Sequence, residues 1–216
     1  MGTPIAIEMI ADVVCPWCYI GWVRLQKAIA LRPDIEATVT WRPYQLDSSL
    51  PDEGVDRKAY YAAKFANVDP DRRAAMQQGL ADNAAQDGLD LKLADIPISP
   101  NTNAAHRLIR WAQQMGLGPA VIEGVMAAYF TDLRDIGDPV VLSEIGAAAG
   151  MDPLMVLGRL SEDFDKDVVT REYVLAARAG VNGVPFYIFA GRTAVSGAET
   201  PENLALAIDR ALELAA

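Results

Sequence analysis

The stretch that decides the fold is Asp12-Val13-Val14-Cys15-Pro16-Trp17-Cys18-Tyr19-Ile20-Gly21, in which two cysteines enclose two residues. The preceding residues 5–14 are apolar except for two carboxylates, which is typical of a buried strand. From Pro16 onward, apolar residues recur at helical spacing to about Leu31, and proline is tolerated in a first helical turn. A strand is therefore expected to deliver the cysteines to the start of a helix.

This position suits the cysteine pair for thiol–disulfide chemistry. Disulfide exchange needs an accessible, stabilised thiolate and a second thiol close enough to release the mixed disulfide. The unpaired amides of a helix N-terminus favour the thiolate of Cys15, the predicted nucleophile, and Cys18 is the predicted resolving thiol. Trp17 is uncharged and adds no electrostatic stabilisation.

The cysteine pair could also serve a metal site or the core. A C-x-x-C can be half of a zinc site, but four ligands are needed and this chain has two cysteines and one histidine, His106. Such a zinc would have to be shared between two chains, so no metal is expected. Buried cysteines can also pack simply as small hydrophobic residues.

The spacing of apolar residues also predicts strands and helices in the rest of the chain. A second strand is predicted over 35–44, a hairpin over 184–189 and 193–195, and a last helix over 200–214. Helices are expected between them, over 56–66, 71–86, 102–115, 119–133, 139–149, 152–160 and 164–179. The order βαβ, helices, ββα predicts an α/β fold with a large all-helical insertion.

Composition excludes several classes of function. With 216 residues, 51% of them hydrophobic, the chain can bury a core, and no apolar run is long enough to cross a membrane. A formal charge of −10 argues against a nucleic-acid partner. The first residues lack the pattern of a secretory signal, so a cytoplasmic location is expected unless a leader has been removed.

Three segments carry a family resemblance: Cys15-Pro16-Trp17-Cys18-Tyr19-Ile20-Gly21, Asn101-Thr102-Asn103-Ala104-Ala105-His106-Arg107 and Gly180-Val181-Asn182-Gly183-Val184-Pro185-Phe186. Together they resemble the DsbA family in its FrnE-like branch, which is similar to 2-hydroxychromene-2-carboxylate isomerases and kappa-class glutathione transferases. The resemblance implies a thioredoxin-like domain formed by residues 1–45 and 165–216, and an inserted helical domain over 46–164.

The resemblance also implies roles for single residues. Val184-Pro185 is expected to be a cis peptide that faces the cysteines, with the Val184 backbone pairing with substrate and with Pro16 and Trp17 beside it. His106 is a weaker candidate, since a lone helical histidine is usually structural. The isomerase and transferase relatives carry serine where this chain has Cys15, which favours redox turnover here.

Several further candidates come from the residues around these motifs. A carboxylate on the first strand, Asp12 or Glu8, would be able to relay protons to Cys18. Trp17, Tyr19 and Trp22 are candidates for an apolar substrate rim, with core packing as the alternative for Trp22. Ser196-Gly197-Ala198 is a candidate for holding the carboxylate of a glutathione-like ligand, and a simple turn accounts for it equally well.

The leading hypothesis is thus a thiol–disulfide oxidoreductase that needs no bound cofactor, with glutathione as an optional co-substrate. Its partner would be a protein or a small molecule bearing thiols or disulfides. The alternatives are a glutathione-dependent isomerase or transferase acting on a small aromatic substrate, and a non-catalytic client-binding module. The sequence leaves open a homodimer and the direction of electron flow.

Overall fold

The computed structural model describes residues 2–215 and divides the chain into two compact units. The first, here called the sheet unit, is formed by the residues up to Tyr44 together with those from Arg171 onward. The second, the helical unit, spans Gln45–Thr170. Within residues 2–215, no helix has both the length and the apolar character that a membrane span requires.

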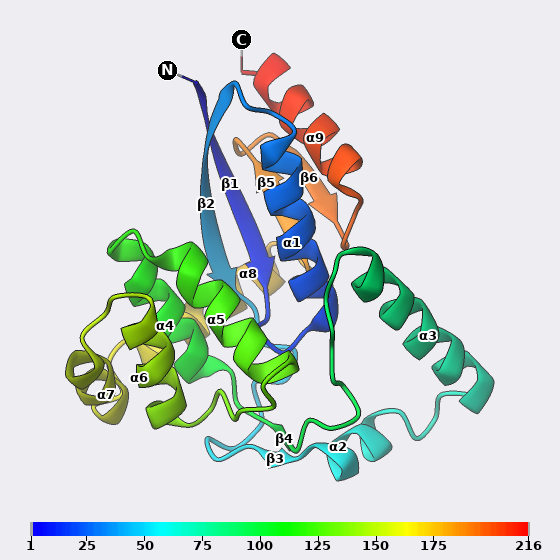
Figure 1. The fold of residues 1–216 in the computed structure, drawn as a ribbon, viewed down its shortest axis with the longest axis vertical. Coiled ribbons are helices and arrows are strands. Elements are labelled where there is room, and N and C mark those ends of the chain that lie inside the picture. Colours follow the sequence, from blue (N-terminus) through cyan, green and yellow to red (C-terminus); the bar gives the residue numbers. More distant parts are fainter. Residues whose placement is uncertain (1, 216) are drawn as a thin grey trace. The chain divides into compact units, whose positions relative to one another are not determined.

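The sheet unit is built on a four-stranded mixed sheet with the strand order β2-β1-β5-β6. The first strand, β1, is parallel to β2 and antiparallel to β5, and β5 is antiparallel to β6. Two helices, α1 and α9, contact each other and lie side by side in Figure 1. The bounds are β1 Thr3–Ala11, α1 Pro16–Ala30, β2 Ile35–Pro43, β5 Phe186–Phe189, β6 Thr193–Ser196 and α9 Pro201–Glu213.

Alternation along β1 shows that one face of this strand is covered. Ile5, Ile7 and Met9 are buried, whereas the residues between them are more exposed, as expected where one face of a sheet is covered. Tyr187 and Phe189 on β5 are fully buried in the same period-two pattern. The sheet unit therefore has an apolar core around the middle strands.

The first strand ends earlier than predicted. The expected strand reached Val14, but β1 ends at Ala11, whose carbonyl accepts a hydrogen bond from the Tyr44 amide at 3.0 Å. The Cys15 amide then donates to the Asp12 carbonyl at 3.1 Å, which closes a turn. The apolar residues 13 and 14 are thus part of a turn, and this turn places Cys15 directly before α1.

The helical unit contains the predicted helices and one small element that was not predicted. Helices α4, α5, α6 and α7 pack on one another. A two-stranded ribbon pairs Val55 with Ser99 and Asp56 with Ile98. The bounds are β3 Val55–Asp56, α2 Arg57–Lys64, α3 Pro70–Gln86, β4 Ile98–Ser99, α4 Asn103–Gln114, α5 Gly118–Phe130, α6 Pro139–Ala148 and α7 Pro153–Ser161, followed by α8 Lys166–Arg178, which crosses the boundary between the units.

Side-chain caps begin several of these helices. Asp69 and Asp138 accept hydrogen bonds from backbone amides at the starts of α3 and α6. At the start of α4, the Asn101 side chain accepts a hydrogen bond from the Asn103 amide at 3.0 Å, and Thr102 makes no capping bond.

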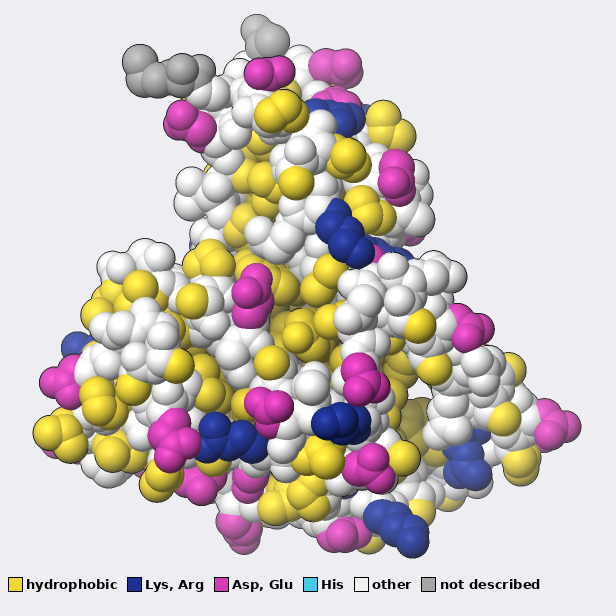
Figure 2. All heavy atoms as spheres, in the orientation of Figure 1, with side chains coloured by type: hydrophobic (Ala, Val, Ile, Leu, Met, Phe, Trp, Pro, Cys, Tyr) yellow, Lys and Arg dark blue, Asp and Glu magenta, His cyan; other side chains and the backbone are white. Residues whose placement is uncertain are grey.

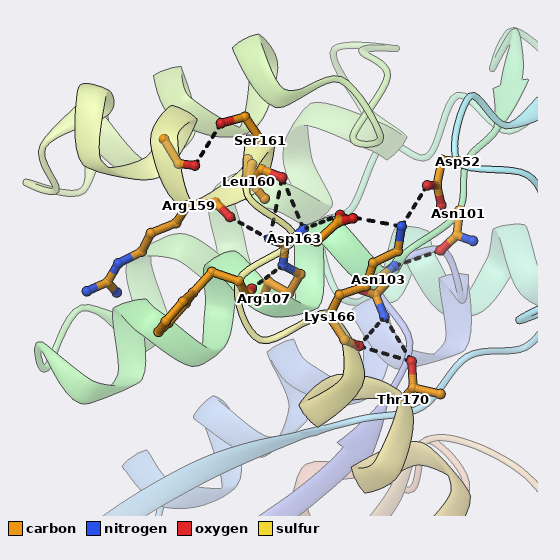
Figure 3. A network of polar contacts seen from close by, with 12 residues as sticks. Asp52, Asn101, Asn103, Arg107, Arg159, Leu160, Ser161, Asp163, Lys166 and Thr170 are labelled. Carbon is orange, nitrogen blue, oxygen red and sulfur yellow. Dashed lines mark hydrogen bonds and ion pairs between the residues drawn. The ribbon is translucent and has the colours of Figure 1, made fainter.

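A buried arginine organises the connection between α7 and α8 (Figure 3). Arg107 donates to the carbonyl oxygens of Phe164 and Arg159, both at 2.6 Å. Next to it, Lys166 forms ion pairs with Asp52 at 2.7 Å and with Asp163 at 3.4 Å. Arg107 therefore adds a side-chain donor to one carbonyl in the last turn of α7 and to one in the segment that follows it.

Charged side chains are dispersed on the face shown in Figure 2. Lys and Arg side chains lie singly among Asp and Glu on this face and do not gather into a basic patch. This distribution fits the net charge of −10.

Candidate active site

The backbone around Cys15 prepares the sulfur for chemistry. Cys15 is the N-cap of α1, with extended backbone angles (φ −89°, ψ 114°), and its side chain makes no capping hydrogen bond. Its carbonyl accepts the amides of Cys18 at 2.9 Å and Tyr19 at 3.2 Å, and Pro16 occupies the first turn. The sulfur thus lies at the positive end of the helix dipole without being used to cap the helix.

The two thiols lie together but in different surroundings. Both are free thiols, and the two cysteines are 3.5 Å apart. Cys15 is 6% exposed, whereas Cys18 is completely buried. Burial raises the pKa of Cys18 well above its ordinary value, and the adjacent Cys15 raises it further. Cys15 is therefore the more accessible of the two thiols, and burial favours the protonated form of Cys18.

A cis proline faces the first thiol. The peptide bond between Val184 and Pro185 is cis, as the resemblance implied. The Cys15 thiol donates to the carbonyl oxygen of Val184 at 3.9 Å, and the carbonyl of Pro185 accepts the Gly197 amide at 2.8 Å. Two segments far apart in sequence thus form one site inside the sheet unit.

Only part of the predicted apolar rim is available to a substrate. Trp17 is 36% exposed and Pro16 is half-buried, so both present surface beside Cys15. Tyr19 and Trp22 are buried, and the Trp22 ring packs edge-on against another core ring. Core packing is therefore the correct interpretation for Trp22 and also holds for Tyr19.

The two candidate proton relays on the first strand have different fates. Asp12 is 1% exposed, and it acts on Cys18 in two opposite ways: a hydrogen bond with its backbone lowers the pKa of Cys18, and its charge raises it. Glu8 forms an ion pair with Arg42 at 2.7 Å, and both side chains are well exposed. The expectation of a buried carboxylate is thus wrong for Glu8, because its side chain lies on the solvent-facing side of β1.

The remaining predicted residues lie elsewhere. His106 is buried on α4 in the helical unit, so it is enclosed by protein, and its role stays a prediction. Within the segment 196–198, the Gly197 amide donates to the Pro185 carbonyl, and the carbonyl of Ala198 accepts a hydrogen bond from Arg24 at 2.7 Å. These bonds make the segment a structured turn.

Two residues of the site were missed from the sequence. The hydroxyl of Tyr187 is buried, and a Cβ atom placed on Gly21 would lie 2.2 Å from it. For Tyr187 a signal was present in the sequence: it carries a hydroxyl on a strand predicted to be buried, and it follows Pro185 by two residues, which places both on the same face. In the described part of the chain, no cluster of three or more His, Cys, Asp or Glu side chains is arranged to hold a metal ion.

Residues 6–209 match the family described as DSBA-like thioredoxin domain. The chain belongs to this family. This DSBA-like protein is 28% identical to a probable DsbA oxidoreductase from Streptomyces coelicolor, with a TM-score of 0.85 over 97% of this chain and 90% of that one. The predicted family, the thioredoxin-like fold and the general class of oxidoreductase are thereby confirmed.

Two further solved structures share the fold of this DSBA-like protein. The cytosolic disulfide reductase DsbM from Pseudomonas aeruginosa, solved with GSH, is 19% identical with a TM-score of 0.61, over 97% of both chains. A 2-hydroxychromene-2-carboxylate isomerase is 16% identical with a TM-score of 0.70, also over 97% of both chains. At these identities the likeness is one of fold, and this fold carries both redox and isomerase chemistry.

Proposed function

We propose that this protein exchanges disulfides with thiol-bearing substrates, with Cys15 as nucleophile and Cys18 as resolving thiol. One observation carries the proposal: Cys15 lies at the N-terminus of α1 beside the carbonyl of Val184, with Cys18 fully buried behind it. An attacking thiol needs access, and a resolving thiol needs proximity and protection from other oxidants.

The dithiol form reduces a substrate disulfide in two steps. The Cys15 thiolate attacks one substrate sulfur, the substrate S–S bond breaks, and the departing thiolate takes up a proton. Cys18 then loses its proton and attacks the Cys15 sulfur, which releases the second substrate thiol. Two electrons pass to the substrate, and the protein is left with a Cys15–Cys18 disulfide. Run backwards, the same steps oxidise a dithiol.

The substrate would lie against the backbone of Val184. An extended peptide at this position is able to bond with the Val184 main chain, while Pro185, Pro16 and Trp17 supply apolar contact. No metal or bound cofactor takes part, and glutathione is proposed as the co-substrate that regenerates the dithiol. A cytoplasmic location belongs to the same proposal, because a reducing compartment keeps the pair as thiols.

Insulin reduction by the wild type and two serine variants tests the proposal. Wild type is expected to reduce insulin with glutathione present, and Cys15→Ser to lose the activity because the attacking sulfur is gone. Cys18→Ser should still react once and accumulate a mixed disulfide, visible as added mass on the intact protein. A Cys15→Ser protein with wild-type activity would contradict the assignment.

The same variants separate the alternative functions. The isomerase fold relative makes a glutathione-dependent reaction on a small aromatic molecule the second candidate. Glutathione-dependent turnover that survives in Cys18→Ser would favour it, because that chemistry needs only one sulfur. No activity in the wild type would favour a client-binding module. A redox titration against glutathione then gives the direction of electron flow.

A further inference from the structure

The hydroxyl of Tyr187 is a buried polar group with no hydrogen-bond partner in the described part of the chain. The residue lies on β5 and is 0% exposed. A buried tyrosine normally satisfies its hydroxyl, so an unsatisfied one points to a partner that forms only in another state of the protein.

The position of this hydroxyl is fixed by the two segments that form the site. Tyr187 follows Pro185 by two residues and so projects from the same face of the chain. Gly21 follows Cys18 by three residues and lies one turn further along the same face of α1. A Cβ atom on Gly21 would lie 2.2 Å from the hydroxyl oxygen and 2.9 Å from Cγ of Pro185. The hydroxyl thus occupies the space left by a glycine on the Cys18 face of the helix.

The groups around this position determine what the hydroxyl is able to do. Burial raises the pKa of Tyr187 well above its ordinary value, and the charge of Cys18 is the next cause. The phenol therefore remains protonated at neutral pH and acts as a donor. The charged and titratable groups that face Tyr187 or Cys18 are Cys15 at the N-cap of α1, Arg24 on α1, Asp12 in the turn before it, and Glu199 after β6.

We propose that Tyr187 is a positioning residue whose hydroxyl donates a hydrogen bond to the Cys18 sulfur while that sulfur is a thiolate. The inference rests on the proposed function, and it concerns the second step only. When Cys18 gives up its proton and attacks Cys15, negative charge develops on a completely buried sulfur. The donor stabilises that charge and keeps its own proton throughout, so the balance of the exchange reaction is unchanged.

Tyr187→Phe tests the proposal because it removes only the hydroxyl oxygen. The chain has two cysteines, so labelling with [13Cβ]cysteine gives one signal per thiol, and Cys15→Ser leaves Cys18 alone. In that background, Tyr187→Phe should lower the thiolate fraction of Cys18 by about 2- to 10-fold at a given pH, the range that one hydrogen bond supplies. Release of the second substrate thiol should slow by the same factor in the protein that retains both cysteines.

Tyr173→Phe on α8 is the matched control and should leave both measurements unchanged. Equal Cys18 titration and equal release rates in Tyr187→Phe and wild type would overturn the proposal. Formation of the first mixed disulfide, measured in Cys18→Ser, reports on the proposed function alone. If that step were absent, the exchange function would fail while the titration still decided whether Tyr187 donates to Cys18.

Discussion

One helical turn separates two thiols that differ sharply in their surroundings. Cys15 retains some exposure at the end of the helix, and Cys18 has none. The turn after β1, in which the Asp12 carbonyl accepts the Cys15 amide, places Cys15 at the N-cap, whereas Cys18 lies inside the helix. Two chemically identical side chains therefore lie in different surroundings, on which the proposed division of their roles rests.

Gly21 gives a prediction at the same scale. A glycine inside a helix usually destabilises it by about 1 kcal/mol relative to alanine. At Gly21 the opposite is expected, because an added Cβ would meet the Tyr187 hydroxyl at 2.2 Å. Gly21→Ala should lower the free energy of unfolding by about 1–3 kcal/mol, the usual range for overpacking, as measured by urea denaturation.

Two companion variants make this prediction specific. Gly79→Ala lies inside α3, where an added Cβ meets nothing within 4 Å, so it should be neutral or stabilising. Tyr187→Phe should recover part of the loss when combined with Gly21→Ala, because it removes the clashing oxygen. An additive double variant would show that the Tyr187 oxygen is not the source of the clash.

At the scale of elements, the end of α7 depends on a side chain from α4. Arg107 bonds the Phe164 carbonyl, which lies between two residues with positive φ, Asp163 (53°) and Asp165 (65°), and also the Arg159 carbonyl in the last turn of α7. Arg107→Met should lower the free energy of unfolding by about 2–4 kcal/mol, because the Phe164 carbonyl loses its guanidinium donor and the Arg159 carbonyl keeps only the Phe164 amide. Limited proteolysis should then cut between residues 162 and 166.

Arg110→Met is the control for this element. Arg110 pairs with Asp165 at 3.4 Å, and its side chain is 32% exposed, so its loss should change stability by less than about 1 kcal/mol. Arg107→Lys should lower the free energy of unfolding as much as Arg107→Met does, since an ammonium group cannot donate to both carbonyls as the planar guanidinium does. Equal stability of the Arg107 and Arg110 variants would contradict the anchoring role.

Most of the helices and strands could be predicted from the sequence, but some contacts between them could not. Helical spacing of apolar residues predicted the helices of the insertion, and together with the proline after Cys15 it predicted α1. The ribbon of β3 and β4 was missed because two-residue strands carry no periodic pattern. The cysteine pair and Pro185 were found from local motifs, whereas Tyr187 beside Gly21 arises from packing between β5 and α1, which no local pattern records.

At the scale of the molecule, stability should fall at both extremes of pH. Hydrogen bonds to Asp47 and Asp209 lower the pKa of each carboxyl. Their stabilisation is complete above the unfolded value of about 4 and is lost as the pH falls through the folded pKa. Both groups are partly exposed, so the acid loss should be modest.

The loss of stability at alkaline pH should be steeper than the loss at acid pH. Burial raises the pKa of Cys18, Tyr187 and Tyr44. Their contribution is complete below the unfolded pKa values, about 8.5 for cysteine and 10 for tyrosine, and is lost as the pH rises toward the folded ones. Thermal midpoints measured from pH 3 to 11 should therefore form a plateau with a marked alkaline fall. Cys18→Ala should flatten the fall above pH 9, and an unchanged profile would contradict the effect of burial on this thiol.

The contact between Cys15 and Val184 also sets the order in which the site is made. The two residues are 169 positions apart. A ribosome adds about 5–20 residues per second, so Cys15 emerges roughly 10–30 s before its partner exists. During that interval β1 has β2 on one side and an unpaired edge on the other, where β5 will later bind. During synthesis both thiols therefore lack the contact with Val184 and β5, and the candidate site is completed only in the final stage of synthesis.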